Sequence, residues 1–325
     1  MRPSSVLDAV LDRSLVLGYS KIGPALRRRW WPADPPAGAL AGQRVVVTGA
    51  TSGIGEAMAR SFLDLGATVH LLGRNPEKVA RYAAELRRDV PTAEVVEEVC
   101  DVGDLDAVRA WCADLSERVE AVHGLVHNAG VMTKQREESA QGHELGLAAH
   151  VLGPHLMNEL LLPLLGEGAG TVVFMSSGGM YSAGLRTEPD EIEYRESEYD
   201  GVRAYARTKR MQVVLADAWS RRLRGGRVRV VSMHPGWADT PGVTDALPGF
   251  GKLVGPILRD AAGGADTAVW LVATRPASAL EEDHQFWHDR ARRPTTYPVQ
   301  RRLDPTDEGR FLAYVSHSTD TSAAW

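Results

Sequence analysis

The sequence predicts an α/β fold built on a single doubly wound parallel sheet with helices on both faces. Two observations carry this prediction. Short β-branched runs alternate with longer stretches of helical periodicity, which is the pattern of parallel strands joined by crossover helices. Polar or glycine-rich segments follow these runs, at the point where the carboxyl ends of parallel strands gather ligand groups. The expected strands are residues 45–47, 68–72, 95–99, 122–126, 171–175 and 227–232.

Length and composition fit one globular domain rather than a fibrous or disordered chain. The 325 residues suffice to bury a large core, and 44% of them are hydrophobic against 24% charged. The net charge of −5 gives no reason to expect nucleic-acid binding. Two cysteines, Cys100 and Cys112, are too few for a disulfide framework and fit a reducing cytoplasm. We expect no metal site, because the histidines between 127 and 155 lack ligand spacing.

The first strand runs into a glycine-rich turn, residues 48–55, which opens a helix. Gly49 permits a tight exit from the strand, and Gly53 lets the backbone approach a pyrophosphate without a Cβ in the way. The free N–H groups at the start of the helix then face the phosphate charge. This pattern predicts a Rossmann-like dinucleotide site. The turn residues expected to bind the cofactor are Gly49, Thr51, Ser52, Gly53, Ile54 and Gly55.

The residue that follows the second strand points to a phosphorylated dinucleotide. Apolar residues recur at helical spacing from Ile54 to Leu65, Gly66 ends that helix, and the next strand runs into Arg74. A site for NAD usually presents a carboxylate here to the ribose 2′-hydroxyl, whereas a guanidinium suits a 2′-phosphate. NADP is therefore the expected cofactor, with NAD disfavoured. The alternative is that Arg74 is a solvated loop residue.

The later strands also end in residues suited to a ligand site. A helix is expected over residues 104–119, between the third strand and the fourth. Because the carboxyl ends of parallel strands meet at one edge of the sheet, we expect the residues that follow them to line one crevice. They are Asp101 and Val102, Asn128, Ala129 and Gly130, Ser176 and Ser177, and His234, Pro235 and Gly236.

A tyrosine and a lysine four residues apart form the second chemical signal. On a helix, Tyr205 and Lys209 would lie on the same face, and the lysine charge would lower the pKa of the phenol. A phenol with its ordinary pKa of about 10 holds its proton too tightly to act as a base at neutral pH. The chain has five lysines, and no other tyrosine has a lysine four residues later. The alternative is an exposed helix pair without a catalytic role.

Taken together, these segments resemble the short-chain dehydrogenase/reductase family, from about residue 43 to residue 289. The resemblance rests on the residues already named and on Thr240, after the sixth strand. Residues 176–180 and 233–242 resemble one subgroup of that family, whose substrate is poorly defined. The resemblance implies an NAD(P)-dependent oxidoreductase that interconverts a carbonyl and an alcohol.

The resemblance also implies a role for each site residue. Tyr205 would be the general acid/base, Ser177 would hydrogen-bond the reacting oxygen, and Lys209 would also bind the nicotinamide ribose. Besides the glycine-rich turn and Arg74, the implied cofactor contacts are Asp101, Val102, Asn128, Ala129, Gly130, Tyr205, Lys209, Pro235, Gly236 and Thr240.

Two histidines depart from the family pattern. His127 stands where an asparagine is common. His150 stands where the family usually has an asparagine that organises a proton relay beside the lysine. If it is catalytic in that relay, its imidazole should lie near the ammonium of Lys209, directly or through one water, and should be neutral because a positive neighbour lowers its pKa. The alternative is a histidine packed in the core.

Several features bear on the substrate and on other classes of function. Apolar residues between 243 and 258 suggest a lipophilic substrate, unless they simply close the domain core. The interval between Ser177 and Tyr205 is long and acidic, which predicts a solvated loop over the active-site mouth. A serine hydrolase is not expected, because Ser177 lacks the glycine-flanked turn that carries the nucleophile in such enzymes. The second function class that stays open is a non-catalytic nucleotide-sensing or scaffold protein.

We expect three segments along the chain. Residues 1–42 form a helical N-terminal extension, residues 43–289 the NADP-binding catalytic domain, and residues 290–325 a C-terminal tail. The extension carries a basic cluster beside two tryptophans, at residues 27–31. It is expected to pack on this protein or on a second subunit, or to contact a membrane surface peripherally. The expected partner is a small carbonyl or alcohol substrate. The protein itself is expected to be a cytoplasmic homo-oligomer.

Overall fold

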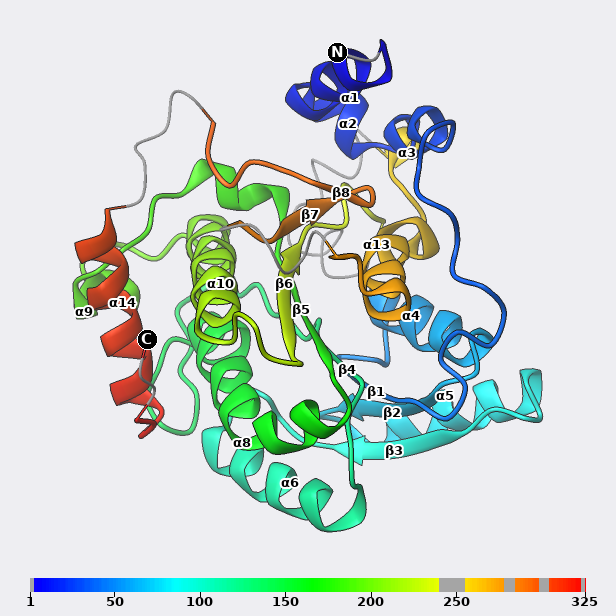
Figure 1. The fold of residues 1–325 in the computed structure, drawn as a ribbon. Helices are drawn as coiled ribbons and strands as arrows, with labels where there is room; N and C mark the ends of the chain where they lie inside the picture. The colour runs from blue at the N-terminus through cyan, green and yellow to red at the C-terminus, as the bar shows by residue number, and fades with distance from the viewer. Residues whose placement is uncertain (1–2, 240–254, 278–283, 298–303, 323–324) are drawn as a thin grey trace.

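The structure, a computed structural model, describes residues 3–239, 255–277, 284–297, 304–322 and 325. One sheet runs in the order β3-β2-β1-β4-β5-β6-β7-β8, and all its strands are parallel except β8, which pairs antiparallel with β7. The predicted α/β class with a parallel sheet is confirmed (Figure 1). The strands are β1 Arg44–Thr48, β2 Thr68–Gly73, β3 Val95–Val99, β4 Gly124–His127, β5 Thr171–Met175, β6 Arg229–Met233, β7 Phe286–His288 and β8 Ala291–Arg292.

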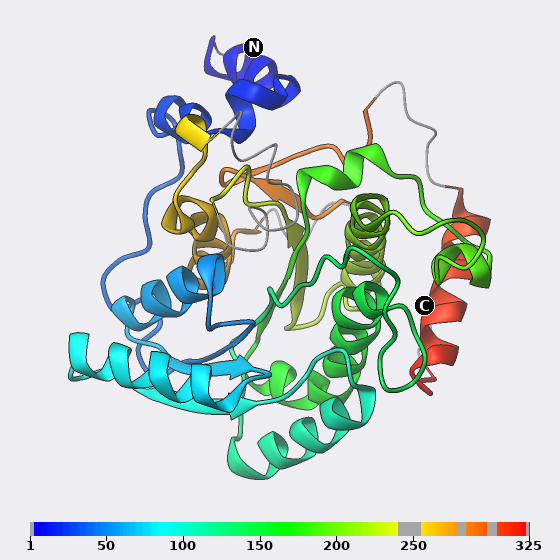
Figure 2. The same ribbon diagram turned by 180° about the vertical axis from the view of Figure 1, so that it is seen from behind.

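Helices cover both faces of this sheet, as Figures 1 and 2 show from opposite sides. Each face has its own cluster of buried apolar side chains, because strands buried on both sides must be covered twice. One face carries α4 Gly53–Asp64, α5 Pro76–Asp89 and α13 Ala261–Thr274, and the other carries α6 Leu105–Arg118, α8 Gly153–Glu167 and α10 Gly201–Arg222.

The strand order places the functional crevice. The chain builds outward from β1 to β2 and β3, and then returns to add β4 on the other side of β1. At this switch point the connections leave in opposite directions, which opens a crevice at the carboxyl ends of β1 and β4. The glycine-rich turn follows β1 and Asn128 follows β4, so both are delivered there.

The starts of two strands and the presence of two short strands differ from the sequence-based expectation. The fourth and sixth strands begin at Gly124 and Arg229, each two residues later than predicted. The short strands β7 and β8 were not predicted, because three and two residues carry no usable periodicity. They are joined by Asp289 and Arg290, both with positive φ, at 50° and 54°. The sheet therefore continues past residue 289, where the catalytic domain was expected to end.

The N-terminal extension folds as three helices against the rest of the chain. They are α1 Pro3–Arg13, α2 Leu15–Tyr19 and α3 Ile22–Arg27. The Tyr19 ring lies against His234, with 4.4 Å between ring centroids, and Arg27 is fully buried with its guanidinium 2.5 Å from the Asp289 carboxylate. Both contacts hold the segment against later parts of the same chain.

The C-terminal segment also ends in a packed helix, α14 Pro305–Ser318, whose apolar face joins the buried cluster around α6, α8 and α10. Beside it lies the acidic insertion, with the short helix α9 Pro189–Ile192 (Figure 1). Glu193 is 1% exposed and accepts hydrogen bonds from His143 and from Tyr314 of α14. The expected loop over the active-site mouth is wrong, because the insertion is tied to α14 instead and none of its described acidic residues lines the pocket.

Candidate active site

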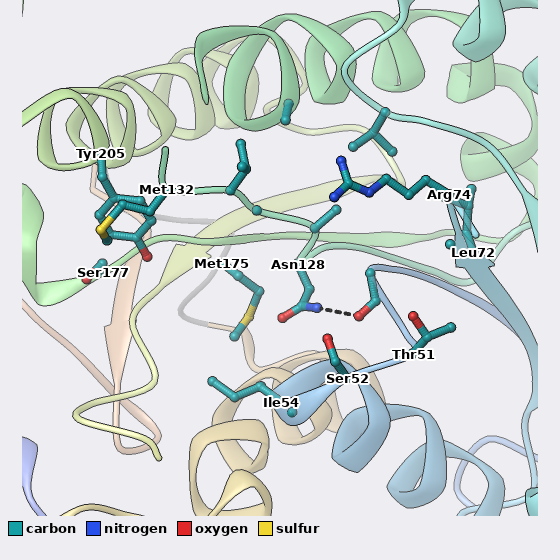
Figure 3. A pocket seen from close by; sticks show the side chains of 18 of the residues that line it. Thr51, Ser52, Ile54, Leu72, Arg74, Asn128, Met132, Met175, Ser177 and Tyr205 are labelled. Carbon is teal, nitrogen blue, oxygen red and sulfur yellow. Dashed lines mark hydrogen bonds between the residues drawn. The ribbon is translucent and has the colours of Figure 1, made fainter. Parts of the chain in front are cut away.

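A pocket of about 420 Å³ lies at the carboxyl ends of the strands. Figure 3 shows Arg74 at one end of it and Tyr205 with Ser177 at the other. Of the predicted site residues, Gly55 and His150 lie behind its wall and Thr240 lies outside the described residues. The remaining ones all line it: Gly49, Thr51, Ser52, Gly53, Ile54, Arg74, Asp101, Val102, Asn128, Ala129, Gly130, Ser177, Tyr205, Lys209, Pro235 and Gly236.

The glycine-rich turn leaves room and donors for a phosphate. Gly49 has φ +66°, and a Cβ there would lie 2.8 Å from the Cα of Ala129. A Cβ on Gly55 would lie 2.1 Å from the Gly49 carbonyl oxygen, which explains why this glycine serves packing from behind the pocket. Ser52 is the N-cap of α4, and its side chain makes no capping bond. The Ser52 side chain therefore does not compete with a pyrophosphate at the start of α4, where the positive end of the helix dipole lies, so these residues fit a dinucleotide.

Asn128 braces the turn against β4. Its side-chain amide donates to the carbonyl oxygens of Thr48 and Gly49, at 3.0 and 3.2 Å. The Thr48 hydroxyl in turn accepts the backbone N–H groups of Asn128 and Ala129, at 3.0 and 2.9 Å. The carboxyl ends of β1 and β4 are thereby held at a fixed separation across the switch point.

Two cations stand at the far end of the pocket. Arg74 follows β2 and is exposed, and within the described ranges its side chain makes no hydrogen bond or ion pair. Lys78 lines the pocket four residues later, in the first turn of α5 after the Asn75 N-cap. Sequence reasoning missed Lys78, although its i+4 spacing from Arg74 could have indicated it.

At the other end, three polar side chains converge. Ser177 lies close enough to Tyr205 to affect the pKa of its phenol, and the Lys209 ammonium lies 5.3 Å from the centre of the Tyr205 ring. Lys209 donates to the Met175 carbonyl oxygen at 2.8 Å, which holds it at the end of β5. The hydroxyl of the neighbouring Ser176 instead donates to the Lys209 carbonyl oxygen at 2.8 Å. Ser177 is thus the serine whose side chain faces Tyr205.

Burial sets the proton affinities of this group. It raises the pKa of Tyr205 to about 12, and the nearby Ser177 hydroxyl offsets only part of that rise. It lowers the pKa of Lys209 to about 7, because the charged ammonium is buried. The expectation that Lys209 brings the tyrosine pKa below its ordinary value is not met in this structure, because burial raises that pKa. The Tyr205 phenol is therefore protonated at neutral pH.

His150 does not face Lys209, contrary to the relay geometry expected from sequence. Its ring is fully buried, where Nε2 accepts the backbone N–H of Val131 at 3.0 Å and Nδ1 pairs with the Thr208 hydroxyl at 2.7 Å. The ring also packs edge-on against Tyr205, with 5.6 Å between centroids. Burial, with the Lys209 charge, lowers its pKa well below the ordinary value, so the neutral form is the expected one.

The apolar walls of the pocket were not predicted. Met132 and Met175 both line the pocket, and Met175 faces its centre (Figure 3). These residues come from a loop and a strand end, and only the fold decides which way they point. The further lining residues missed from sequence are Leu72, Gly73, Asn75, Cys100, Val131, Leu145, Ala149 and Ala238.

Comparison with known proteins agrees with this geometry. The family model for short chain dehydrogenases matches residues 43–248. Human dehydrogenase/reductase SDR family member 12 is 33% identical over 284 residues, covering 87% of this chain and 88% of that protein. The chain belongs to the short-chain dehydrogenase/reductase family. Mouse retinol dehydrogenase 14 is 30% identical over 252 residues, covering 73% of each chain.

Solved structures show that this short-chain dehydrogenase/reductase has the fold of its family. An uncharacterised protein from Mycobacterium paratuberculosis aligns with a TM-score of 0.66 at 24% identity, covering 91% of this chain and 99% of its own. A short-chain dehydrogenase from Shigella flexneri complexed with NADP aligns with a TM-score of 0.62 at 23% identity, covering 77% and 98%.

Family membership makes the protein an NAD(P)-dependent oxidoreductase of the short-chain type. Across the described ranges, no group of three or more histidine, cysteine or acidic side chains is arranged to hold a metal ion. None of the helices in those ranges has both the length and the apolar character that crossing a bilayer requires.

Proposed function

We propose that the protein is an NADP-preferring enzyme that interconverts a carbonyl and an alcohol on a lipophilic small molecule. The observation that carries this proposal is the convergence of Ser177, Tyr205 and Lys209 on the same pocket as the glycine-rich turn. The alternative, a non-catalytic nucleotide-sensing or scaffold protein, would not need a hydroxyl pair and a buried ammonium at one end of that pocket.

The side chains divide the chemistry between them. The bound cofactor would supply or accept the hydride. Ser177 and Tyr205 hold the carbonyl oxygen through their hydroxyls, and Tyr205 donates its proton as negative charge develops there. The Lys209 ammonium stabilises the phenolate that remains, because the two charges are opposite. In the oxidation direction the phenolate takes the proton of the alcohol.

The substrate class is supported by the pocket wall and by a relative. Met132 and Met175 give the reacting end an apolar lining. Most of residues 243–258, from which a lipophilic substrate was inferred, lie outside the described residues. Mouse retinol dehydrogenase 14 is named for an alcohol, retinol. A spectrophotometric panel of carbonyls and alcohols with NADPH, NADH and their oxidised forms tests the proposal, and cofactor binding without any turnover would favour the scaffold alternative.

The preference for NADP is proposed from Arg74, with Lys78 as a second cation beside it. Arg74→Asp is expected to shift the ratio of NADPH to NADH dissociation constants by about 10- to 100-fold toward NADH. It removes a charge-assisted contact of about 1.5–3 kcal/mol and adds repulsion against the 2′-phosphate. Fluorescence titration of both cofactors measures the ratio. The control is Arg88→Asp in the last turn of α5, whose side chain is 72% exposed and does not line the pocket. If the ratio of the NADPH and NADH dissociation constants does not change in Arg74→Asp, then Arg74 does not contribute to cofactor preference.

Peripheral contact with an anionic membrane is proposed for the N-terminal helices. Four of the exposed large apolar side chains, Leu7, Val10, Val16 and Leu17, lie on α1 and α2, at one end of the molecule (Figure 1). The two acidic residues of α1 turn inward, where both lie beside the buried Arg293. The outward face is left apolar and cationic, with Arg13, Lys21, Arg28 and Arg29 exposed, which suits anionic headgroups.

Sedimentation with vesicles tests this contact. The double variant Val10→Glu and Leu17→Glu is expected to weaken binding to vesicles of phosphatidylcholine and phosphatidylserine by more than about tenfold, since two apolar side chains no longer insert. Val99→Glu is the matched control, because Val99 is 51% exposed on β3, away from these helices. Absence of binding by the unaltered protein would contradict the proposal.

A cytoplasmic homo-oligomer completes the proposal. Both cysteines, Cys100 and Cys112, are free and buried, which fits a reducing compartment. Light scattering of the same variants reports the oligomeric state. It also separates subunit packing from membrane binding as the role of the N-terminal helices.

A further inference from the structure

Lys209 is held by neutral acceptors, with no carboxylate partner among the described residues. Its ammonium donates to the Met175 carbonyl oxygen at 2.8 Å and to Oε1 of Gln212 at 3.0 Å. The side chain is almost fully buried, yet it reaches the pocket. An ammonium has three N–H groups, so one remains for a group bound in the pocket.

Gln212 joins this ammonium to the helix turn that carries His150. The glutamine is fully buried, and its Nε2 donates to the His150 carbonyl oxygen at 2.9 Å. Only one orientation of the amide satisfies both bonds, because an ammonium can only donate and a carbonyl can only accept. The route from residue 150 to Lys209 therefore runs through the backbone and Gln212, and not through the imidazole.

The local sequence explains why the His150 carbonyl takes a side-chain donor. In an α-helix it would accept the N–H four residues later, but that residue is Pro154, which has none. The chain passes this point as a π turn over Ala148–Leu152, a form of helix that often marks functional sites. Gln212 donates to the carbonyl that the proline leaves without its α-helical partner.

We propose that Gln212 is a positioning residue for Lys209, which fixes the ammonium as a donor toward the pocket and closes the buried side of the site to proton transfer. This inference rests on the proposed function. A primary amide neither gives nor takes a proton near neutral pH, whereas a water, hydroxyl or imidazole in its place would pass one on. Tyr205 therefore exchanges its proton from the pocket side.

The pH dependence of cofactor binding tests the inference without turnover. NADPH is an anion, so its affinity should fall as Lys209 loses its proton, near pH 7 in the unaltered protein. Gln212→Glu puts a carboxylate beside the ammonium, raises its pKa, and should move this fall upward by about one pH unit or more. Gln212→Met removes an acceptor from the ammonium and should move the fall downward. Fluorescence titration from pH 5.5 to 9 measures both shifts.

Two controls make the outcome decisive. Gln43→Met removes a partly buried amide away from the pocket and should leave the pH dependence unchanged. If both Gln212 variants keep the original pH dependence and lose only melting temperature, Gln212 merely packs and the inference is wrong. Turnover of Tyr205→Phe tests the proposed function separately, because the Lys209 titration is measured from binding alone.

Discussion

Tyr205→Phe is expected to lower kcat by about 10²- to 10⁴-fold, the usual contribution of general acid–base catalysis. The change deletes one hydroxyl and little volume. In this structure burial raises the pKa of Tyr205 to about 12, so the phenol carries the proton that reduction requires at neutral pH. Phenylalanine has none to give. Dissociation constants for NADPH should stay nearly unchanged, because the glycine-rich turn and Lys209 are untouched.

Steady-state rates and fluorescence titration together measure this split between turnover and binding. The matched control is Tyr199→Phe. The Tyr199 hydroxyl bonds Thr133 and Glu144 and does not line the pocket, so its loss should leave turnover close to the original rate. Full activity in Tyr205→Phe would overturn the assignment of Tyr205 as the general acid/base.

Asp289→Asn is expected to destabilise the fold by about 3–5 kcal/mol, because it removes one partner from a buried ion cluster. Asp289 is 2% exposed and lies 2.5 Å from the guanidinium of Arg27 and 2.5 Å from that of Arg259. Both arginines are themselves buried, and the loss leaves Arg27 with Asp8 alone and Arg259 without a carboxylate among its described partners. At about 2 °C per kcal/mol for a chain of this size, the melting temperature should fall by roughly 6–10 °C.

The control for this prediction is Asp64→Asn. Asp64 pairs with Arg60 at the surface, where the two side chains are 56% and 42% exposed. An exposed pair of this kind contributes less than about 1 kcal/mol, so melting should hardly change. Equal and small effects at both positions would show that the buried cluster does not hold the fold together.

The same cluster ties the N-terminal helices to the reacting end of the pocket. Arg259 donates to the carbonyl oxygens of Gly18 and Tyr19, at 2.8 and 2.9 Å, while the backbone N–H of Trp237 donates to Tyr19 at 2.7 Å. Trp237 directly follows Gly236, which lines the pocket. Deleting the residues before Gly38 is thus expected to cost stability, because it removes these partners.

The features that the sequence determined by itself are those that depend on neighbours along the chain. Thr48 to Gly55 specifies a strand, a tight turn and a helix start within eight residues, and the structure folds them that way. The spacing of Tyr205 and Lys209 puts both on one helix face, whatever packs around it. Pro154, which has no N–H, also removes the α-helical hydrogen-bond partner of the His150 carbonyl.

Tertiary structure alone decided what depends on distant segments. The pKa values of Tyr205 and Lys209 depend on burial, which no spacing reveals, and burial reversed the shift expected for the tyrosine. The direction of the His150 ring depends on Val131 and Thr208, from two other parts of the chain. Arg27 and Asp289 lie 262 positions apart, and local periodicity carries no information about such a pair. Chain propensity acts over a few residues, whereas burial and charge pairing exist only once the sheet and its helices have closed.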